Sequence, residues 1–414
     1  MSKLRLDIRQ PMTSRLHLLA LALPILSCSH GSSSGRASAS ISSCDLVIRH
    51  VRLFDGDVDR GLVDLAVQGG RIARIGAVGD GCAGATTVDG TGKYLVPGLV
   101  NAHVHLWKQS DLSAALQAGV FAVFALHSSE GPGAAFRQLR DSSGYASYYS
   151  AGYAATVPGG HPTELFPIET VNDSVTPEQF VAHRIAKGAD LIKIVSGNLT
   201  PGSLWAGNPT LSYAQIEAIA HAARTHNRKV VVHVAQIGET VRIARLGVDG
   251  FAHLWSYGES ATDEQLRTLA KTGVFIIPTV LLQQRAWQTI EREPNKEHAF
   301  RNFLSPMPTV LREIRRVHDA GIPIVAGTDA PNYGVNYTDD LIEELEIYAR
   351  AGLPNADVLR SATGTPARLF QLDGIGRIAV GSRANMILVN VDPLANIAAL
   401  RQIAGIWKNG TRVR

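Results

Sequence analysis

Two histidines, His103 and His105, lie two residues apart in the apolar run VPGLVNAHVHL at residues 96–106. In a β-strand the side chains of residues i and i+2 point to the same face, so both imidazoles would be directed at one place. A metal ion needs such a convergence of ligands on a rigid element. The alternative for an isolated pair is that each histidine is buried and satisfied by one hydrogen bond. Further ligands elsewhere in the chain decide between these two interpretations.

Four more polar residues lie inside other apolar runs or at their carboxyl ends. They are Lys193 in LIKIVSG, His233 in VVVHVAQ, His253 in GFAHLW and Asp329 in IPIVAGTDA. Each has an ordinary structural explanation when taken alone. A histidine is satisfied in the core, a lysine extends its head group to water, and an aspartate caps the next segment. The fold that carries these runs decides whether the residues act together.

The middle of the chain, residues 99–372, alternates short apolar strands with helical patterns. Strands are predicted at residues 99–106, 120–127, 148–156, 191–197, 230–236, 250–255, 275–280 and 322–330, and helices at residues 177–187, 213–227, 239–246, 263–271 and 309–320. This alternation predicts a parallel sheet, and eight strands predict an α/β fold with a closed (β/α)8 TIM barrel. Two further helices are predicted after the eighth strand, at residues 339–351 and 356–370.

The barrel brings the polar residues to one place. The carboxyl ends of the strands form a single mouth, where the chemistry of such barrels takes place. Unpaired charged groups buried there by chance would each cost several kcal/mol. We therefore interpret the six residues as one metal site: His103, His105, Lys193, His233, His253 and Asp329.

Segments at both ends of the chain have a different pattern. Residues 45–98 consist of short apolar strands separated by Gly and Asp turns, and residues 373–414 have the same character. Because the two segments flank the barrel, we expect them to assemble into one small antiparallel β-sandwich. Pro97 and Gly98 mark the passage from this sandwich into the first strand of the barrel.

Residues 1–28 have the pattern of a secretory signal peptide, in which basic residues precede the apolar run LHLLALALPIL at residues 16–26. This run is too short to span a membrane. Residues 25–28 resemble a bacterial lipobox with Cys28 as the lipidated first mature residue, and plain cleavage of the signal is the alternative. Residues 29–44 are expected to be a flexible tether. The expected location is the periplasm or the outer membrane, with the lipid anchor as the only membrane contact.

Composition and cysteine content limit the kinds of partner and the covalent links that are expected. The chain of 414 residues is 45% hydrophobic and 18% charged, with a formal net charge of +4. The basic excess is concentrated in the leader. No later cluster of Lys and Arg could contact the phosphates of a nucleic-acid backbone, so no nucleic-acid partner is expected. In an oxidising compartment Cys44 and Cys82 are candidates for a disulfide, with two independent thiols as the alternative.

These motifs resemble the amidohydrolase superfamily of metal-dependent hydrolases. The resemblance runs from about residue 45 to the C-terminus and rests on PGLVNAHVHL, the IKI strand, the two single histidines, GTDAPN and the closing run ATGTPARLFQLDGIGRIAVGSRANMILVNVDP. A strand-four lysine with four histidines and an aspartate is similar to the dinuclear subtype. The resemblance implies that Lys193 reacts with CO2 to form a carbamate that bridges two divalent ions, commonly zinc. It assigns His103, His105 and Asp329 to the first ion and His233 and His253 to the second.

The chemistry that this site implies is hydrolysis. Two cations lower the pKa of a shared water and polarise the substrate carbonyl. Asp329 can accept a proton from the hydroxide and deliver it to the leaving nitrogen, which leaves poorly unless it is protonated. The expected substrate is a small amide, such as a dipeptide or an N-acyl amino acid.

Substrate residues are predicted from a narrower resemblance. The segment TVPGGHPTE at residues 156–164 resembles a GGH motif that follows strand three in the Xaa-Pro dipeptidase and imidazolonepropionase-like group. His161, Gly160 and Tyr153 are therefore candidate substrate contacts. For His161, a surface position in a loop is the alternative.

Two departures from these relatives concern the substrate. Where relatives often read GVTTVRD on strand two, residues 119–125 read GVFAVFA, and His127 is a candidate for the mouth instead. Where relatives often carry His-Gly after GTDAPN, the chain has Tyr337 and Thr338. The loops predicted at residues 196–210 and 281–305 carry no transferable pattern. The metal-binding set is complete, whereas substrate recognition does not carry over.

Three functions remain to be compared. The first is an exported dinuclear amidohydrolase. The second is a mononuclear hydrolase of a cyclic amide, or a lactonase or esterase, in which Lys193 would be a bystander. The third is a lipoprotein that binds a ligand or metal without turnover, which the loss of a ligand residue would favour; all six positions are filled.

Overall fold

The computed structural model describes residues 43–79, 82–196, 207–255, 260–295 and 304–414. The expected signal peptide, Cys28 and nearly all of the expected tether lie outside the described residues. Within the described ranges, no helix is long and apolar enough to cross a membrane.

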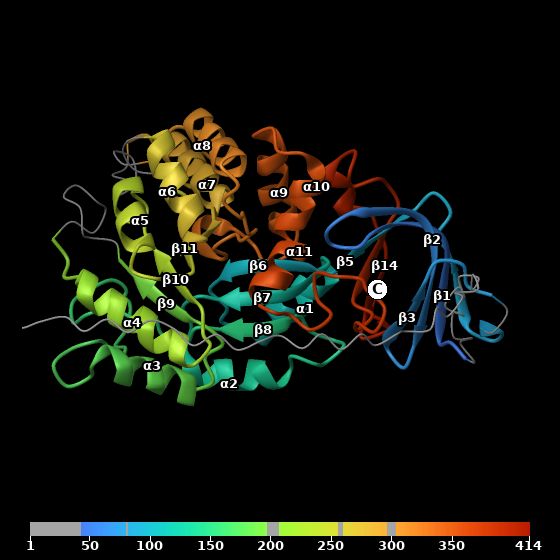
Figure 1. The fold of residues 1–414 in the computed structure, drawn as a ribbon, viewed down its shortest axis with the longest axis horizontal. Helices are drawn as coiled ribbons and strands as arrows, with labels where there is room; N and C mark the ends of the chain where they lie inside the picture. Colours follow the sequence, from blue (N-terminus) through green and yellow to red (C-terminus); the bar gives the residue numbers. More distant parts are fainter. Residues whose placement is uncertain (1–42, 80–81, 197–206, 256–259, 296–303) are drawn as a thin grey trace, which may run out of the picture. The chain divides into compact units, whose positions relative to one another are not determined.

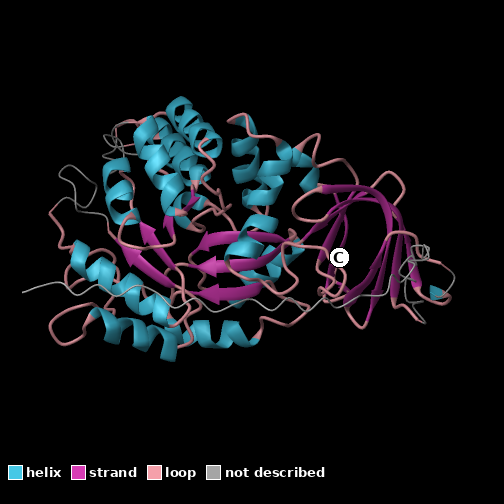
Figure 2. Cartoon of the chain, viewed as in Figure 1, coloured by secondary structure: helices cyan, strands magenta, loops and turns pink. Residues whose placement is uncertain are grey.

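Parallel strands form the centre of the fold (Figures 1 and 2). One sheet contains β6 (Leu99–Val104), β7 (Val120–Ala125) and β8 (Ser147–Ser150), and another contains β9 (Ile192–Val195), β10 (Val230–His233), β11 (Gly250–Ala252) and β12 (Phe275–Ile277). A parallel bridge between Ala155 and Ile194 joins the two sheets on one side. On the other side, residues 322–330 bridge β12 and β6 and close the ring. The predicted TIM barrel is confirmed.

The eighth predicted strand is extended but forms no continuous ladder. The backbone N–H of Ala102 donates to the carbonyl of Ala326 at 2.9 Å, which ties this segment to β6. A Cβ at Gly327 would lie 2.5 Å from the side chain of Ile277, so only glycine fits at this approach. Asp329 then enters the left-handed region with a φ of 62°. The irregular backbone therefore ends the segment at the residue expected to hold the metal.

Helices cover the outside of the barrel (Figure 2). They are α1 (Gln109–Gln117), α2 (Glu130–Gln138), α3 (Pro177–Ala186), α4 (Tyr213–Thr225), α5 (Ile237–Ala244), α6 (Asp263–Thr272), α7 (Val280–Arg292), α8 (Met307–Asp319), α9 (Asp340–Arg350), α10 (Asn355–Ser361) and α11 (Gly364–Leu369). Capping boxes begin α3, α4 and α6 at Thr176, Ser212 and Thr262. In each box the side chain of the capping residue and that of a glutamine satisfy N–H groups that the helix leaves open.

Two helical predictions were wrong. The segment at residues 281–305 was interpreted as a loop, but α7 occupies its first half. The helix expected at residues 356–370 is interrupted at Thr363, where φ is −134° and ψ is −96°. Thr363 leaves the helical path because its neighbour Gly364 donates a backbone hydrogen bond to Gly56, at 3.1 Å. A contact with the terminal sheet therefore divides the helix into α10 and α11.

The strands from both chain ends form one curved sheet. It contains β1 (Leu46–Phe54), β2 (Asp59–Gln68), β3 (Arg71–Ile75), β4 (Thr86–Asp89) and β5 (Tyr94–Pro97) together with β13 (Met386–Val389), β14 (Ile403–Lys408) and β15 (Thr411–Arg412). The expectation of a purely antiparallel unit was wrong, because β1 runs parallel to both β4 and β5. The sheet curves until β3 meets residues 382–384, where Ile72 donates to Ser382 at 2.8 Å.

The curved sheet encloses its own apolar core, as expected of a sandwich. Leu53, Leu65 and Trp407 are among the buried residues of this core, which is separate from the core of the barrel. Beside it, Cys44 and Cys82 form a disulfide. Of the two interpretations of these cysteines, the structure therefore has the bonded pair.

Candidate active site

All six residues predicted as metal ligands line one cavity of about 330 Å³ at the carboxyl ends of the barrel strands. His103 lies on β6 and His105 directly after it, Lys193 lies on β9, and His233 ends β10. His253 follows β11, and Asp329 ends the eighth segment. Neighbouring apolar side chains fill the barrel wall, so each polar side chain is directed into the cavity by the alternation of the strand that carries it.

The ligand atoms face one another at short distances. The Nε2 atoms of His103 and His105 lie 3.1 Å and 2.8 Å from the same oxygen, Oδ1 of Asp329. The ring centroids of His103 and His253 are 5.1 Å apart, and those of His233 and His253 are 4.5 Å apart. The four imidazoles therefore form a continuous series around the floor of the cavity.

Hydrogen bonds outside the cavity fix the orientation of two of these rings. The Nδ1–H of His105 donates to the backbone carbonyl of His127 at 3.0 Å. The hydroxyl of Thr279 donates to the carbonyl of Pro278 at 2.8 Å, and so it accepts from the Nδ1–H of His253, at 2.6 Å. With the proton on Nδ1, each neutral ring turns the lone pair of Nε2 toward the cavity, which is the arrangement that a metal ligand needs.

Burial controls the charge of the histidines and the lysine. It lowers the pKa of His103 and His233 well below the ordinary value and that of His253 to about 4, so these imidazoles are neutral near pH 7. Burial also lowers the pKa of Lys193 to about 7. The site therefore favours neutral nitrogen ligands and an uncharged amine.

The carboxyl group of Asp329 has the opposite tendency. Burial raises its pKa, but the facing imidazoles of His103 and His105 outweigh this effect and hold the pKa well below the ordinary value. An ionised carboxylate is therefore retained at the centre of the cavity.

The residues present fit a divalent metal ion. The Nε2 atoms of His103 and His105 approach Oδ1 of Asp329 without forming hydrogen bonds to it, and both ring nitrogens of His103 and this oxygen are buried without a hydrogen-bond partner in the described part of the chain. Ligand atoms of His103, His253 and Asp329 all lie within 4.8 Å of one another. Buried polar atoms are normally satisfied, and neutral imidazole with carboxylate is a donor set that suits zinc and related ions.

Of the three candidate substrate residues, one lines the cavity and two do not. His161 lines the cavity, and its Nδ1 contacts Glu164. Gly160 and Tyr153 are not among the described residues that line the cavity, so the structure does not place them as substrate contacts. Gly160 packs closely against the carbonyl of Pro209. The ring of Tyr153 lies behind His127, with a centroid separation of 5.9 Å.

Two residues of the cavity wall have no assigned role in the sequence resemblance. His127, the candidate that follows β7, lines the cavity. Gln283 also lines it and comes from α7, which was interpreted as a loop. The buried positions Val280, Gln283, Ala286 and Ile290 of α7 are three or four residues apart, as in a helix, but the polar Gln283 breaks the apolar stripe and weakens this signal in the sequence.

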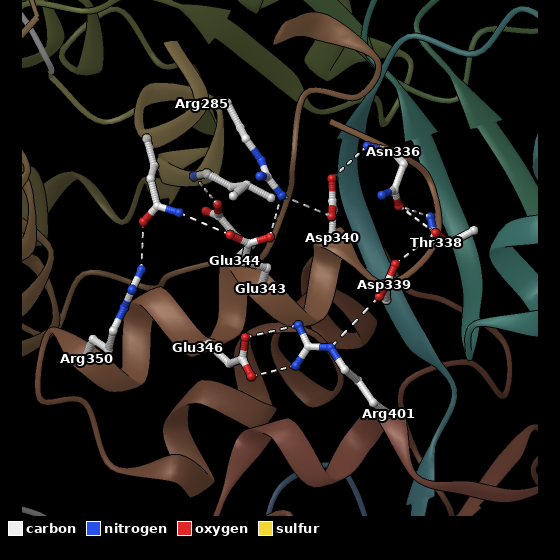
Figure 3. A network of polar contacts seen from close by, with 12 residues as sticks. Arg285, Asn336, Thr338, Asp339, Asp340, Glu343, Glu344, Glu346, Arg350 and Arg401 are labelled. Atoms are coloured by element: carbon white, nitrogen blue, oxygen red, sulfur yellow. Dashed lines mark hydrogen bonds and ion pairs between the residues drawn. The ribbon is translucent and has the colours of Figure 1, made fainter. Parts of the chain in front are cut away.

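Helix α7 is held rigidly against α9. The carboxylate of Glu344 on α9 accepts from the backbone N–H groups of Val280 and Leu281, at 2.9 Å and 2.6 Å. Figure 3 shows further ion pairs in this region, including Arg285 with Glu343 at 2.6 Å. A carboxylate at a helix N-terminus satisfies open N–H groups and the positive end of the helix dipole. The wall that α7 contributes to the cavity is therefore preorganised.

Comparison with known proteins places the chain in a family. The model of the Amidohydrolase family matches residues 94–413. An adenine deaminase from Deinococcus deserti is 24% identical over 368 residues, which are 86% of this chain and 58% of that protein. The chain thus spans less than two thirds of the curated relatives at the head of the comparison.

Solved structures agree with this fold. A Xaa-Pro dipeptidase with bound methionine superimposes with a TM-score of 0.72 at 22% identity, covering 89% of this chain and 99% of that chain. A putative prolidase from Bifidobacterium longum superimposes with a TM-score of 0.74 at 25% identity, covering 89% of this chain and 94% of that chain.

The barrel carries a group of candidate metal-ligating side chains at the carboxyl ends of its strands. The chain belongs to the Amidohydrolase family.

Proposed function

We propose that this protein is an exported dinuclear amidohydrolase that cleaves a C–N amide bond in a small molecule, such as a dipeptide or an N-acyl amino acid. His103, His105 and Asp329 would hold one divalent ion, with zinc as the expected metal. His233 and His253 would hold the second, and carboxylated Lys193 would bridge both. The observation that carries the proposal is the position of Lys193, which is 2% exposed on the floor of a cavity lined by metal-ligating side chains.

An unmodified lysine would oppose metal binding at this position. An ammonium group is cationic and offers no lone pair, so it would repel two divalent ions. The uncharged amine, in contrast, can attack CO2. A new N–C bond forms, one proton is released to solvent, and the product is a carbamate with one negative charge and two oxygen atoms. Such a group can reach both ions, and its charge offsets part of theirs.

Several residues of the chain have distinct roles in the proposed hydrolysis. When bound at these residues, two divalent ions would supply a water of lowered pKa and a Lewis acid for the substrate carbonyl. The carboxylate of Asp329, whose pKa lies well below the ordinary value, accepts a proton from the attacking water. It then returns this proton to the nitrogen of the leaving amine. The hydrogen bonds from His105 to the His127 carbonyl and from His253 to Thr279 keep the ligand rings oriented.

A mononuclear hydrolase of a cyclic amide or a lactone is the second candidate. It is favoured by the compact group of His103, His253 and Asp329, whose ligand atoms lie within 4.8 Å of one another. A single ion in this group would leave Lys193 without a ligand role.

Metal content and a lysine variant separate these two candidates. The protein should be purified in bicarbonate and divalent zinc, and its metal content measured together with hydrolysis of a panel of dipeptides, N-acyl amino acids and lactones. We expect about two ions per chain, a mass increased by one CO2, and near-complete loss of hydrolysis in Lys193→Ala. Lys271→Ala, which changes an exposed lysine at the end of α6, is the control. One ion per chain with unchanged turnover in Lys193→Ala would reject the dinuclear mechanism.

Export with lipidation at Cys28 is a separate part of the proposal and rests on the leader sequence alone. Fractionation of cells that express the full chain, with labelled palmitate, tests it. Incorporation of label into the wild-type protein but not into Cys28→Ser is expected. Unlabelled protein in the cytoplasm would reject this location.

A further inference from the structure

Apart from the metal-binding residues, the wall of the cavity is largely apolar. Trp107, Leu165, Phe166, Leu254, Leu282, Ala286 and Leu304 contribute to it. Three side chains at the mouth are unusually exposed for their type: Trp107 at 42%, Leu165 at 64% and Tyr333 at 40%. An apolar rim around a concave site indicates a ligand that brings apolar surface to it. Among the described lining residues, Lys193 and Asp329 are the only lysine, arginine or acidic side chains.

His127 offers a hydrogen-bond donor to this cavity. The backbone N–H of Ala154 donates to Nδ1 of His127 at 3.1 Å. Since a backbone N–H can only donate, Nδ1 carries the lone pair and the neutral ring carries its proton on Nε2. His127 is 6% exposed, and its Nε2 makes no hydrogen bond to any described residue.

The ring of His127 is fixed in this orientation by its neighbours. Phe166 stacks on it with centroids 5.5 Å apart, and Tyr153 packs on it at 5.9 Å. The backbone carbonyl of His127 is already used by the metal-site histidine His105. The donor therefore has little freedom to find a partner elsewhere, and a molecule in the cavity is the partner available to it.

Gln283 is a second polar side chain of the wall without a partner. It is 6% exposed, and neither Oε1 nor Nε2 of its amide hydrogen-bonds to a described residue. It lies on α7 one residue after Leu282, in the turn whose N–H groups are anchored by Glu344. Leaving a buried polar group unsatisfied is costly, so such groups in a site usually mark the position of a ligand atom.

We propose that the substrate is an uncharged amide with bulky apolar flanks and a further neutral hydrogen-bonding group, and that His127 and Gln283 are the positioning residues that bind its neutral polar groups. This inference rests on the proposed amide hydrolysis and specifies its substrate class: it favours small amides without a free carboxylate, and so disfavours the dipeptides and free N-acyl amino acids named above as examples. The Nε2–H of His127 would donate to a carbonyl oxygen, and the amide of Gln283 would pair with a carbonyl or an N–H. A substrate with a free carboxylate on its flank would gain no cationic partner from the described wall.

Three probes of equal length test this substrate class. They are the para-nitroanilides of pentanoic acid, of N-acetylglycine and of glutaric acid, whose acyl chains are apolar, neutral polar and anionic. Release of para-nitroaniline by the metal-loaded full chain gives kcat/KM for each. We expect the N-acetylglycine probe to be preferred over the pentanoyl probe by about 2- to 12-fold, the factor for one neutral hydrogen bond. The glutaryl probe should be the poorest.

A pair of substitutions isolates the donor of His127. In His127→Asn the side-chain oxygen can still accept from Ala154, but the donor at the Nε2 position is lost. His127→Gln places an amide at the Nε2 position. The preference for the N-acetylglycine probe should disappear in His127→Asn, through KM rather than kcat, and return in part in His127→Gln. His221→Asn, at an exposed position of α4, is the control. Gln283→Leu should lower kcat/KM for the N-acetylglycine probe more than for the pentanoyl probe.

Each outcome bears on one of the two proposals. Equal kcat/KM for the pentanoyl and N-acetylglycine probes, or a preference that survives both His127→Asn and Gln283→Leu, would overturn the inference. So would a preference for the glutaryl probe. If no probe is hydrolysed, binding is measured by quenching of tryptophan fluorescence, since Trp107 lines the cavity. Binding with the expected order but without turnover would support the inference and contradict the proposed anilide hydrolysis. Absence of binding would contradict the inference itself.

Discussion

Thr279 is a sensitive position for a test of the metal site, although it is not a metal ligand. It follows β12, is 1% exposed, and has a φ of 51°. Its hydroxyl donates to Pro278 at 2.8 Å and accepts from the Nδ1–H of His253 at 2.6 Å. Replacement by valine keeps the branched shape and volume but removes both hydrogen bonds. The ring of His253 then loses the contact that sets its tautomer and orientation.

The size of the effect follows from these two bonds. Loss of the partner that orients a metal-ligating histidine typically weakens metal binding by about 10- to 100-fold. This corresponds to about 1.4–2.8 kcal/mol of binding free energy. In the metal-free protein, the buried N–H of His253 is left unsatisfied, which costs about 1–3 kcal/mol of unfolding free energy. The backbone strain at a φ of 51° is common to threonine and valine and so cancels in the comparison.

The assay is a zinc titration of chelator-stripped protein in competition with a chromophoric chelator. We expect Thr279→Val to bind at least one ion 10- to 100-fold more weakly than wild type, as scaled above, and to lose activity unless zinc is in excess. Thr279→Ser keeps the hydroxyl and is the matched control, with affinity close to that of wild type.

An unchanged zinc affinity in Thr279→Val would refute the reasoning. It would mean that His253 either is not a ligand or needs no partner at Nδ1. An equal loss in Thr279→Ser would also count against it, because the effect would then come from the shape of the side chain and not from the hydroxyl.

Two further predictions concern stability. Burial raises the pKa of Glu344 to about 7 from its ordinary 4.5, so the stability it contributes is fully present below pH 4.5 and is lost as pH rises through about 7. The unfolding free energy of wild type minus that of Glu344→Gln, measured by urea unfolding, should fall by about 3 kcal/mol across this range; a difference that does not change with pH would contradict the assignment. The Cys44–Cys82 disulfide closes a separation of 38 residues, so Cys44→Ser with Cys82→Ser should lower the unfolding free energy by about 4 kcal/mol. Reduction of the wild type should give the same loss, and an unchanged urea midpoint would contradict this reasoning.

The barrel was accessible from the sequence because its strands are short apolar runs with polar residues at their ends. His103 and His105 could be assigned to one face of a strand from their spacing alone. The direction of pairing in the terminal sheet was not accessible in the same way. Alternation of apolar and polar residues in β1 has the same appearance whether its neighbours run parallel or antiparallel.

Helix α7 was missed because the contacts that fix its N-terminus come from a distant part of the chain. Its N-terminal N–H groups are satisfied by Glu344 from α9 and not by a local capping side chain. Its buried positions also include Gln283, a polar residue that interrupts the apolar stripe. The donor of His127 was hidden for a similar reason, since its tautomer depends on a contact with Ala154, in the segment that follows β8.

The pairing of β5 with β13, in which Pro97 is the register partner of Met386, has a consequence for the order of folding. Nearly the whole barrel is synthesised between these two strands, so at typical elongation rates β5 waits on the order of 15–60 s for its neighbour. During this time one edge of the N-terminal sheet is open, and open edges are sites of misassociation. Completion of the sheet is therefore expected to be a late, high-contact-order step. A chain that ends before β13 would keep the barrel sequence and the metal ligands but leave β5 as a permanent edge.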